Sequence, residues 1–170
     1  MIDDNLANSL ATSALSLWEA GELEQAASQY ASAIAVAPKV PDWHMARGGV
    51  LQQLSRHEEA TTEYEAAVAL ELAQHDSEAY PGVKVARYFL ADHLVTQGNP
   101  AKALEVLAPA VAALPDDWLV GTAQALALFA IGRKGEARSV AKHAISNAGW
   151  ESKKAELTER LTEVLAACNG

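Results

Sequence analysis

The chain has very little cysteine: Cys168 is its one thiol, so an internal disulfide cannot form. Proteins that fold without disulfides are typical of reducing compartments, and we expect a cytoplasmic location. No apolar run approaches the roughly 20 residues needed to cross a bilayer, so we expect no membrane insertion. The acidic start Met1-Ile2-Asp3-Asp4 also lacks the basic segment with which a secretory signal begins.

Catalytic and metal-binding patterns are missing as well. The five histidines are scattered, no two are three or four residues apart, and we interpret them as surface residues: His44, His57, His75, His93 and His143. His57-Glu58-Glu59 is not followed by the second histidine of a zinc protease motif. Gly48-Gly49 is an isolated pair rather than a phosphate-binding loop. We therefore expect a protein that is not an enzyme and that uses no metal or cofactor.

Basic residues are scarce in the first half of the chain. Residues 1–85 hold 13 acidic and 4 basic residues, a net charge of −9, whereas residues 86–170 hold 9 of each. Nucleic acid is excluded as a partner of that half, because phosphate binding requires a positive surface. A basic protein or peptide suits this charge, and the alternative is that the charge serves only solubility.

What the chain does have is an internal repeat with a period of 34 residues. Gly21, Ala26, Tyr30 and Ala33 return, at an offset of 34, as Ser55, Ala60, Tyr64 and Ala67. The spacing of Gly98, Ala103, Leu107 and Ala110 is the same, and it occurs again in Gly132, Ala137, Ala141 and Ala144. Alanine is frequent while valine and isoleucine are sparse, which favours helices over strands. Each repeat therefore predicts two helices joined by a turn at the Gly or Ser position.

This pattern resembles the tetratricopeptide repeat, a helix-turn-helix unit of 34 residues with small residues at fixed positions. The resemblance implies an all-α fold, a right-handed superhelical solenoid of four helix pairs in one domain spanning 1–170. We place the repeats at about 7–40, 41–74, 84–117 and 118–151. The family prefers tryptophan early in the first helix of each repeat, and this chain has other residues there: Leu10, His44, Arg87 and Gly121.

Two segments fall outside the repeats. An insertion at 75–83 separates the second and third repeats, and it either lengthens the preceding helix or forms an exposed loop. Residues 152–168 form an amphipathic segment with Leu157, Leu161 and Val164 on one face. Because the last repeat of a solenoid leaves an apolar face bare, we expect this segment to be a capping helix with Cys168 buried near its end.

The resemblance also implies where a ligand lies, because the family binds partners along the concave surface lined by the first helices. Carrying that surface over predicts a partner-binding groove of mainly apolar and aromatic residues: Leu15, Trp18, Met45, Gly49, Gln52, Tyr88, Asp92, Val95, Leu126 and Phe129. An apolar stripe of this kind is typical of an interface. The alternative is that several of these side chains pack inside the fold. The Lys and Asn clamp of the branch that binds chaperone tails is replaced by Ala11, Leu15, Ala46, Val85 and Phe89.

The predicted function is therefore a non-catalytic module, adaptor or chaperone-like, that binds an apolar or amphipathic segment of a partner protein. A second hypothesis is an immunity or antitoxin protein that blocks a basic toxin through an acidic patch: Glu58, Glu59, Glu63 and Glu65. A third is a regulatory, non-catalytic subunit of a larger assembly. The acidic patch and a basic stripe of Lys134, Arg138 and Lys142 could also join copies of the chain head to tail as a homo-oligomer.

Overall fold

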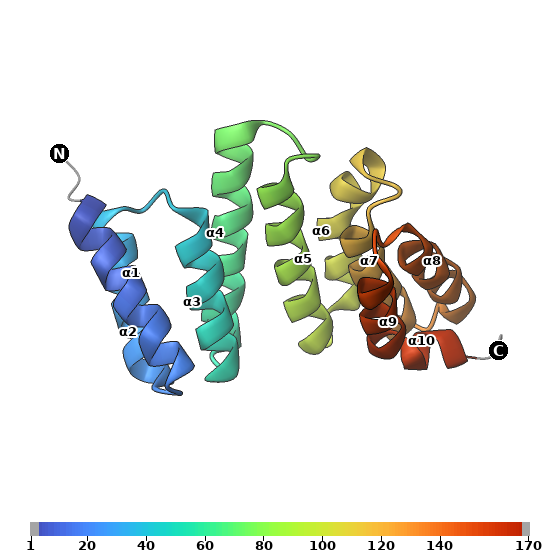
Figure 1. Cartoon of the computed structure of the whole chain (residues 1–170), viewed down its shortest axis with the longest axis horizontal. Coiled ribbons are helices and arrows are strands. Elements are labelled where there is room, and N and C mark those ends of the chain that lie inside the picture. The colour runs from blue at the N-terminus through green and yellow to red at the C-terminus, as the bar shows by residue number, and fades with distance from the viewer. Residues whose placement is uncertain (1–3, 168–170) are drawn as a thin grey trace. The chain divides into compact units, whose positions relative to one another are not determined.

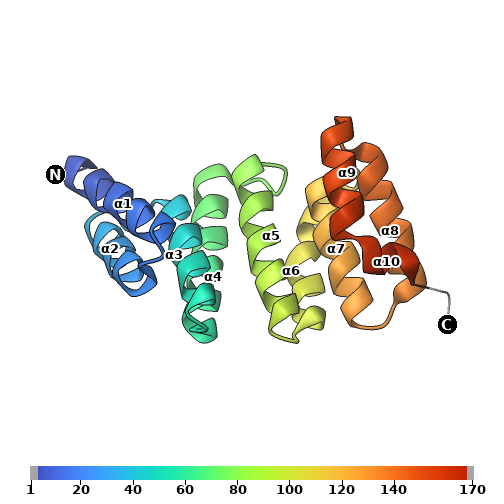
Figure 2. The ribbon, with the colours of Figure 1, turned by 60° about the horizontal axis from the view of Figure 1, so that its bottom comes forward.

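The computed structural model describes residues 4–167, which form ten α-helices joined by short turns (Figures 1 and 2). The turn inside each helix pair contains one residue with left-handed backbone geometry. That residue is Gly21 (φ 79°), Ser55 (φ 60°), Gly98 (φ 73°) or Gly132 (φ 84°), each at the position the repeat predicts. Glycine adopts this conformation without the steric cost that other residues meet, which explains why it recurs. The predicted all-α architecture of helix pairs is confirmed.

The chain divides into two compact units, residues 1–76 and 77–170, and each is described by itself. In unit 1, α1 (Asp4–Glu19) pairs with α2 (Leu23–Val36), and α3 (Pro41–Gln53) pairs with α4 (His57–His75). Helix α2 also packs against α3. The first helices of the pairs, α1 and α3, therefore share one face of unit 1, which we call its first-helix face (Figure 1).

Alanine at the repeat positions sets the close spacing of the helices in unit 1. Ala26, Ala33, Ala60 and Ala67 are all fully buried, and a small side chain at these points lets two helices approach closely. Tyr64, at a repeated tyrosine position, is 3% exposed and packs on Gly48, where an added Cβ would lie 2.8 Å from the tyrosine ring. A glycine at position 48 is therefore needed for this helix contact.

Unit 2 holds the remaining pairs, α5 (Pro81–Thr96) with α6 (Pro100–Ala113) and α7 (Trp118–Ala130) with α8 (Lys134–Asn147). Helix α7 also contacts both α5 and α6. Asp117 begins α7: its carboxylate accepts hydrogen bonds from the backbone N–H groups of Leu119 and Val120 and pairs with Lys84 Nζ at 2.6 Å. The capping carboxylate thus also links the first turns of α5 and α7.

The two segments outside the repeats differ in detail from their predicted bounds. Helix α4 runs to His75 and α5 begins at Pro81, so the non-helical part of the predicted 75–83 insertion is only 76–80. Glu78 in this loop pairs with Arg87 at 2.7 Å, which fixes the loop to α5. The predicted 152–168 helix is two helices, α9 (Glu151–Arg160) and α10 (Thr162–Ala166), while Cys168 lies outside the described residues. The break lets Leu161 and Val164 join the apolar cluster of α7 and α8.

Candidate functional site

A hollow of about 270 Å³ opens on the first-helix face of unit 1. It lies between α1 and α3, and we call it the unit 1 hollow; its lining is Asn8, Ala11, Thr12, Leu15, Tyr30, Asp42, Trp43 and Ala46. Leu15 is 46% exposed although it is a large apolar residue, whereas Tyr30 at the back is buried. Burial raises the pKa of Tyr30, and the Glu19 carboxylate raises it further. The hollow is therefore an apolar depression whose one acidic side chain is Asp42.

Four other predicted groove residues of unit 1 lie around a packed contact between α1 and α3. Trp18 donates its indole N–H to Gln53 Oε1 at 3.2 Å, and its ring lies against Gly49, where an added Cβ would be 3.1 Å away. Gln52 accepts a hydrogen bond from the Tyr64 hydroxyl at 3.2 Å. Trp18, Gly49 and Gln52 are only partly exposed, as is Met45. Among the predicted groove residues of unit 1, Leu15 alone lines the hollow, and its side chain is exposed.

A buried ionic cluster supports α3 beneath this face. His44 Nδ1 lies 2.7 Å from Glu63 Oε2, Arg47 donates to the other Glu63 oxygen, and His44 Nε2 lies 3.2 Å from the Pro38 carbonyl. The hydrogen bond to Glu63 raises the pKa of His44, against the effect of burial. Burial alone would raise the pKa of Glu63, but the hydrogen bond with His44 and the charge of Arg47 lower it overall. His44 and Glu63 are each 9% exposed, so this cluster is a structural joint between α3 and α4.

The cluster changes two of the sequence-based interpretations. His44 is not a surface histidine, and neither is His93, which is fully buried. Glu63 does not belong to an exposed acidic patch with Glu58, Glu59 and Glu65, because its carboxylate points into the α3–α4 joint. Glu59 is exposed and pairs with Arg56 at 2.7 Å. Of the predicted patch, Glu58, Glu59 and Glu65 are therefore the exposed members.

The predicted groove residues of unit 2 are more enclosed than expected. Tyr88 is 8% exposed, and burial raises the pKa of its hydroxyl. Asp92 is bound by Arg160 of α9 at 2.7 Å, and Val95 is partly buried. Leu126 and Phe129 pack against the cluster that contains Leu161 and Val164 of the C-terminal segment. This bears out the alternative that some of these side chains pack inside the fold.

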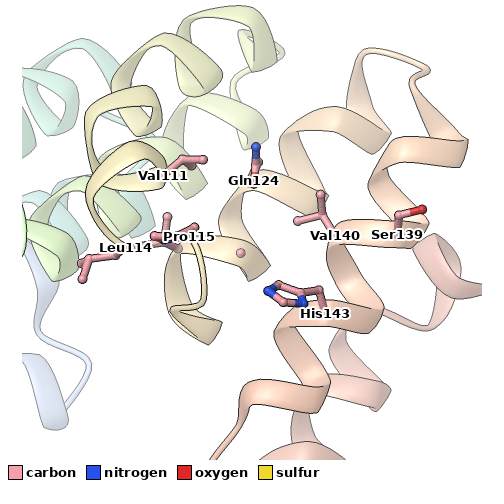
Figure 3. A pocket seen from close by; sticks show the side chains of 9 residues that line it. Val111, Leu114, Pro115, Gln124, Ser139, Val140 and His143 are labelled. Atoms are coloured by element: carbon pink, nitrogen blue, oxygen red, sulfur yellow. The ribbon is translucent and has the colours of Figure 1, made fainter.

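Sequence reasoning missed a second depression, on the side of unit 2 formed by α6 and α8 and floored by α7 (Figure 3). Two adjoining hollows of about 260 and 340 Å³ share Val111, Gln124 and Val140 as lining residues. His143 lies at one end and bonds Asp116 at 2.8 Å. The sequence signal for this depression was the spacing of Leu104, Ala108 and Val111. It places the three residues in one stripe along the outer side of α6, next to the buried alanines of that helix.

Within residues 4–167 no group of three or more His, Cys, Asp or Glu side chains could hold a metal ion. No helix in that range is both long and apolar enough to cross a membrane.

A tetratricopeptide repeat family model matches residues 12–81 and 88–149, most of the chain. The chain belongs to the tetratricopeptide repeat family. The resemblance predicted from the 34-residue period is thus confirmed, and the family fold is that of a protein–protein interaction module. No curated protein matches the sequence significantly.

Solved structures with the tetratricopeptide repeat fold are similar to this chain at low identity. The 41-end segment of MamA from Desulfovibrio magneticus RS-1 is 19% identical, with a TM-score of 0.67 over 96% of this chain and 94% of that one. PilF from Pseudomonas aeruginosa is 22% identical, with a TM-score of 0.68 over 95% and 70%. YrrB, described as a tetratricopeptide repeat protein with an unusual peptide-binding site, is 21% identical, with a TM-score of 0.60 over 92% and 78%. At these identities the likeness establishes the fold alone.

Two of the four positions where tetratricopeptide repeats prefer tryptophan hold a side chain that is paired with a glutamate. His44 pairs with Glu63, and Arg87, 9% exposed, pairs with Glu78 and donates to the Val106 carbonyl at 2.8 Å. In the fourth repeat Gly121 faces Ala144, whose Cβ would be 3.0 Å from an added Cβ. Two repeats thus replace a large aromatic with a buried, carboxylate-paired cation or imidazole, which positions the first helix by charge as well as by packing.

Proposed function

We propose that the protein is a non-catalytic binding module that holds an apolar or amphipathic segment of a partner protein on the first-helix face of unit 1. The observation that carries the proposal is Leu15, which is 46% exposed at the edge of the unit 1 hollow beside Trp43. An exposed apolar side chain beside an aromatic wall and an alanine floor is typical of a pocket for a partner's anchor residue. Ala11 and Ala46 leave the space that this anchor would fill.

The charge of unit 1 defines the partner further. Residues 1–76 contain 12 acidic and 3 basic residues, a net charge of −9. Arg47 and Arg56 are already paired with glutamates, and Asp42 stands at the hollow. A segment with an apolar anchor and flanking Lys or Arg residues complements this surface, and its association is accelerated by long-range attraction. The peptide-binding site of YrrB, which shares the fold, supports a peptide as the class of ligand.

The test is a selection of peptides of about 12 residues from a random display library on the full chain, followed by titration of the enriched peptides. We expect an apolar or aromatic residue next to Lys or Arg, and binding that weakens as salt rises, because the Debye length falls to about 3 Å at 1 M. Leu15→Asp should weaken binding at least tenfold because it places a charge in the apolar depression.

The matched control is Ser28→Asp, which adds the same charge at an exposed position of α2, away from the hollow. It should leave the peptide affinity within about twofold of the unmodified protein. Selected peptides that bind equally well to the Leu15→Asp protein would show that the hollow is not the binding site. Circular dichroism of both variants separates lost binding from lost folding.

A further inference from the structure

The first helices of the two pairs in unit 2, α5 and α7, pack against each other and form the first-helix face of that unit. Helix α9 lies on this face, beside α7 (Figures 1 and 2). Near its start, Lys153 Nζ lies 5.2 Å from the centroid of the Trp118 ring at the beginning of α7. At its end, the Arg160 guanidinium lies 5.3 Å from the centroid of the Tyr88 ring and bonds Asp92 at 2.7 Å, both on α5. Helix α9 therefore reaches past its sequence neighbours to the first helix of the third repeat.

The residues that make these contacts follow a recognition pattern. Lys153, Leu157 and Arg160 are spaced i, i+4 and i+7, which places them on one side of a helix. Leu157 between the two cations is 2% exposed, whereas Glu151, Thr158 and Glu159 point to solvent. This is how an amphipathic helix docks into a groove, with one apolar anchor and a cation on each side of it.

The contacts of α9 differ in kind from those of α10. Leu161 and Val164 are buried in the apolar cluster with Leu128 and its neighbours, so α10 is the part of the C-terminal segment that caps the repeats. Apart from Leu157 and its packing against α8, α9 is held through partly exposed charges: the Arg160 side chain is 39% exposed and that of Asp92 is 31% exposed. Such exposed pairs are individually weak, so α9 can be released while the cluster stays intact.

We propose that the first-helix face of unit 2, marked by Tyr88, Asp92 and Trp118, is a second binding surface that α9 occupies in cis. Its external ligand is an amphipathic helix in which an apolar residue lies between two Lys or Arg residues seven positions apart. Such a helix competes with α9 for the aromatic rings and for the Asp92 carboxylate. The tethered α9 keeps the surface closed, because a short tether gives an effective concentration of about millimolar.

The probe for this surface is a side-chain-stapled helical peptide with the sequence of residues 150–161, added to ¹⁵N-labelled full-length protein. In the unmodified protein, about 0.05 mM peptide should leave the Trp118 indole and Asp92 amide signals in place, because α9, tethered at an effective concentration of about millimolar, outcompetes it. Arg160→Glu places like charges opposite each other at Asp92, and amide exchange in α9 should become roughly tenfold faster. The peptide should then shift both signals in a saturable manner.

The matched variants distinguish release of α9 from its surface from a general loss of structure in unit 2. Asp92→Arg combined with Arg160→Glu restores an ion pair of opposite polarity, so α9 should close again and the added peptide should not bind. Glu159→Gln, on the solvent side of α9, should behave as the unmodified protein does. If Arg160→Glu disturbs the fold by circular dichroism, Lys153→Ala with Arg160→Ala opens α9 without introducing repulsion.

Two results would overturn the proposal. One is α9 exchange that is unchanged in the opened variants, which would make α9 a fixed part of the cap. The other is faster exchange with no peptide-induced shift at Trp118 or Asp92, which would show that the uncovered face binds no such helix. All the reporters lie in unit 2, so neither result depends on whether the unit 1 hollow binds its partner.

Discussion

Replacing Glu63 with alanine should destabilise unit 1 more than replacing Glu58 or Glu59 with alanine, which are the other glutamates in the first two turns of α4. The substitution leaves His44 and Arg47 at the α3–α4 joint without the carboxylate that both contact. Removing one partner of a buried ion pair costs about 3–5 kcal/mol, because the remaining charge is left without compensation. The Arg47 side chain is 20% exposed and can reach water, so we expect the lower end, about 3 kcal/mol.

The pH dependence of this loss follows from the two pKa shifts. The raised pKa of His44 gives stability that is complete below its usual value of 6.5 and is lost as pH rises through the raised value. The lowered pKa of Glu63 gives stability that is complete above its usual 4.5 and is lost as pH falls through the lowered value. The difference between the unmodified protein and Glu63→Ala should therefore be largest between pH 4.5 and 6.5 and smaller on either side.

Urea unfolding followed by circular dichroism at a series of pH values measures this difference directly. In thermal melts the change at pH 6 should be roughly 6–12 °C for a chain of this size. Glu58→Ala is the matched control, since Glu58 is exposed on the same helix, and should cost less than about 1 kcal/mol, the size of a helix-dipole contribution. A Glu63→Ala loss that equals the control, or that does not vary with pH, would refute the account of a coupled buried cluster.

Three further substitutions test the repeat geometry by chemical denaturation. Ser55→Gly should stabilise the chain by about 0.5–1 kcal/mol, because Ser55 has the left-handed geometry that glycine adopts freely at the three equivalent turns; an unchanged midpoint would count against this. Gly48→Ala should cost about 1–3 kcal/mol, since the new Cβ would meet the Tyr64 ring, whereas Gly149→Ala, with no atom within 4 Å, should be nearly neutral. Asp117→Ala should cost about 1 kcal/mol through loss of the α7 cap, and the exposed Asp116→Ala less; equal effects would contradict the cap assignment.

The sequence was sufficient to predict the helix pairs, because a repeat fixes several independent features at once. Gly21, Gly98 and Gly132 marked turns that need left-handed geometry. The alanines five and twelve residues after each of them marked close packing within the second helices. The family model confirms this assignment. The ends of segments outside the repeat, at 76–80 and at Leu161, could not be placed, because they depend on tertiary contacts such as Glu78 with Arg87.

The candidate site was harder to predict, because helical periodicity gives the face of a residue and not its exposure. Leu15 and Tyr88 both belong to the predicted groove, yet Leu15 is 46% exposed and Tyr88 is 8% exposed with Arg160 over its ring. Nothing in the local sequence of α5 indicates that α9 covers it. Glu63 was placed on a surface patch for the same reason, since its partners His44 and Arg47 lie on another helix.

The central claim, that the unit 1 hollow holds a partner segment, is tested most directly by site-specific photo-crosslinking. A photoreactive amino acid at position 15 of the full chain, with the library-selected peptide as probe, should give a crosslinked product that excess unlabelled peptide suppresses. The same amino acid at position 28, exposed on α2, should give none. Equal crosslinking at both positions, or crosslinking at position 28 alone, would contradict the claim.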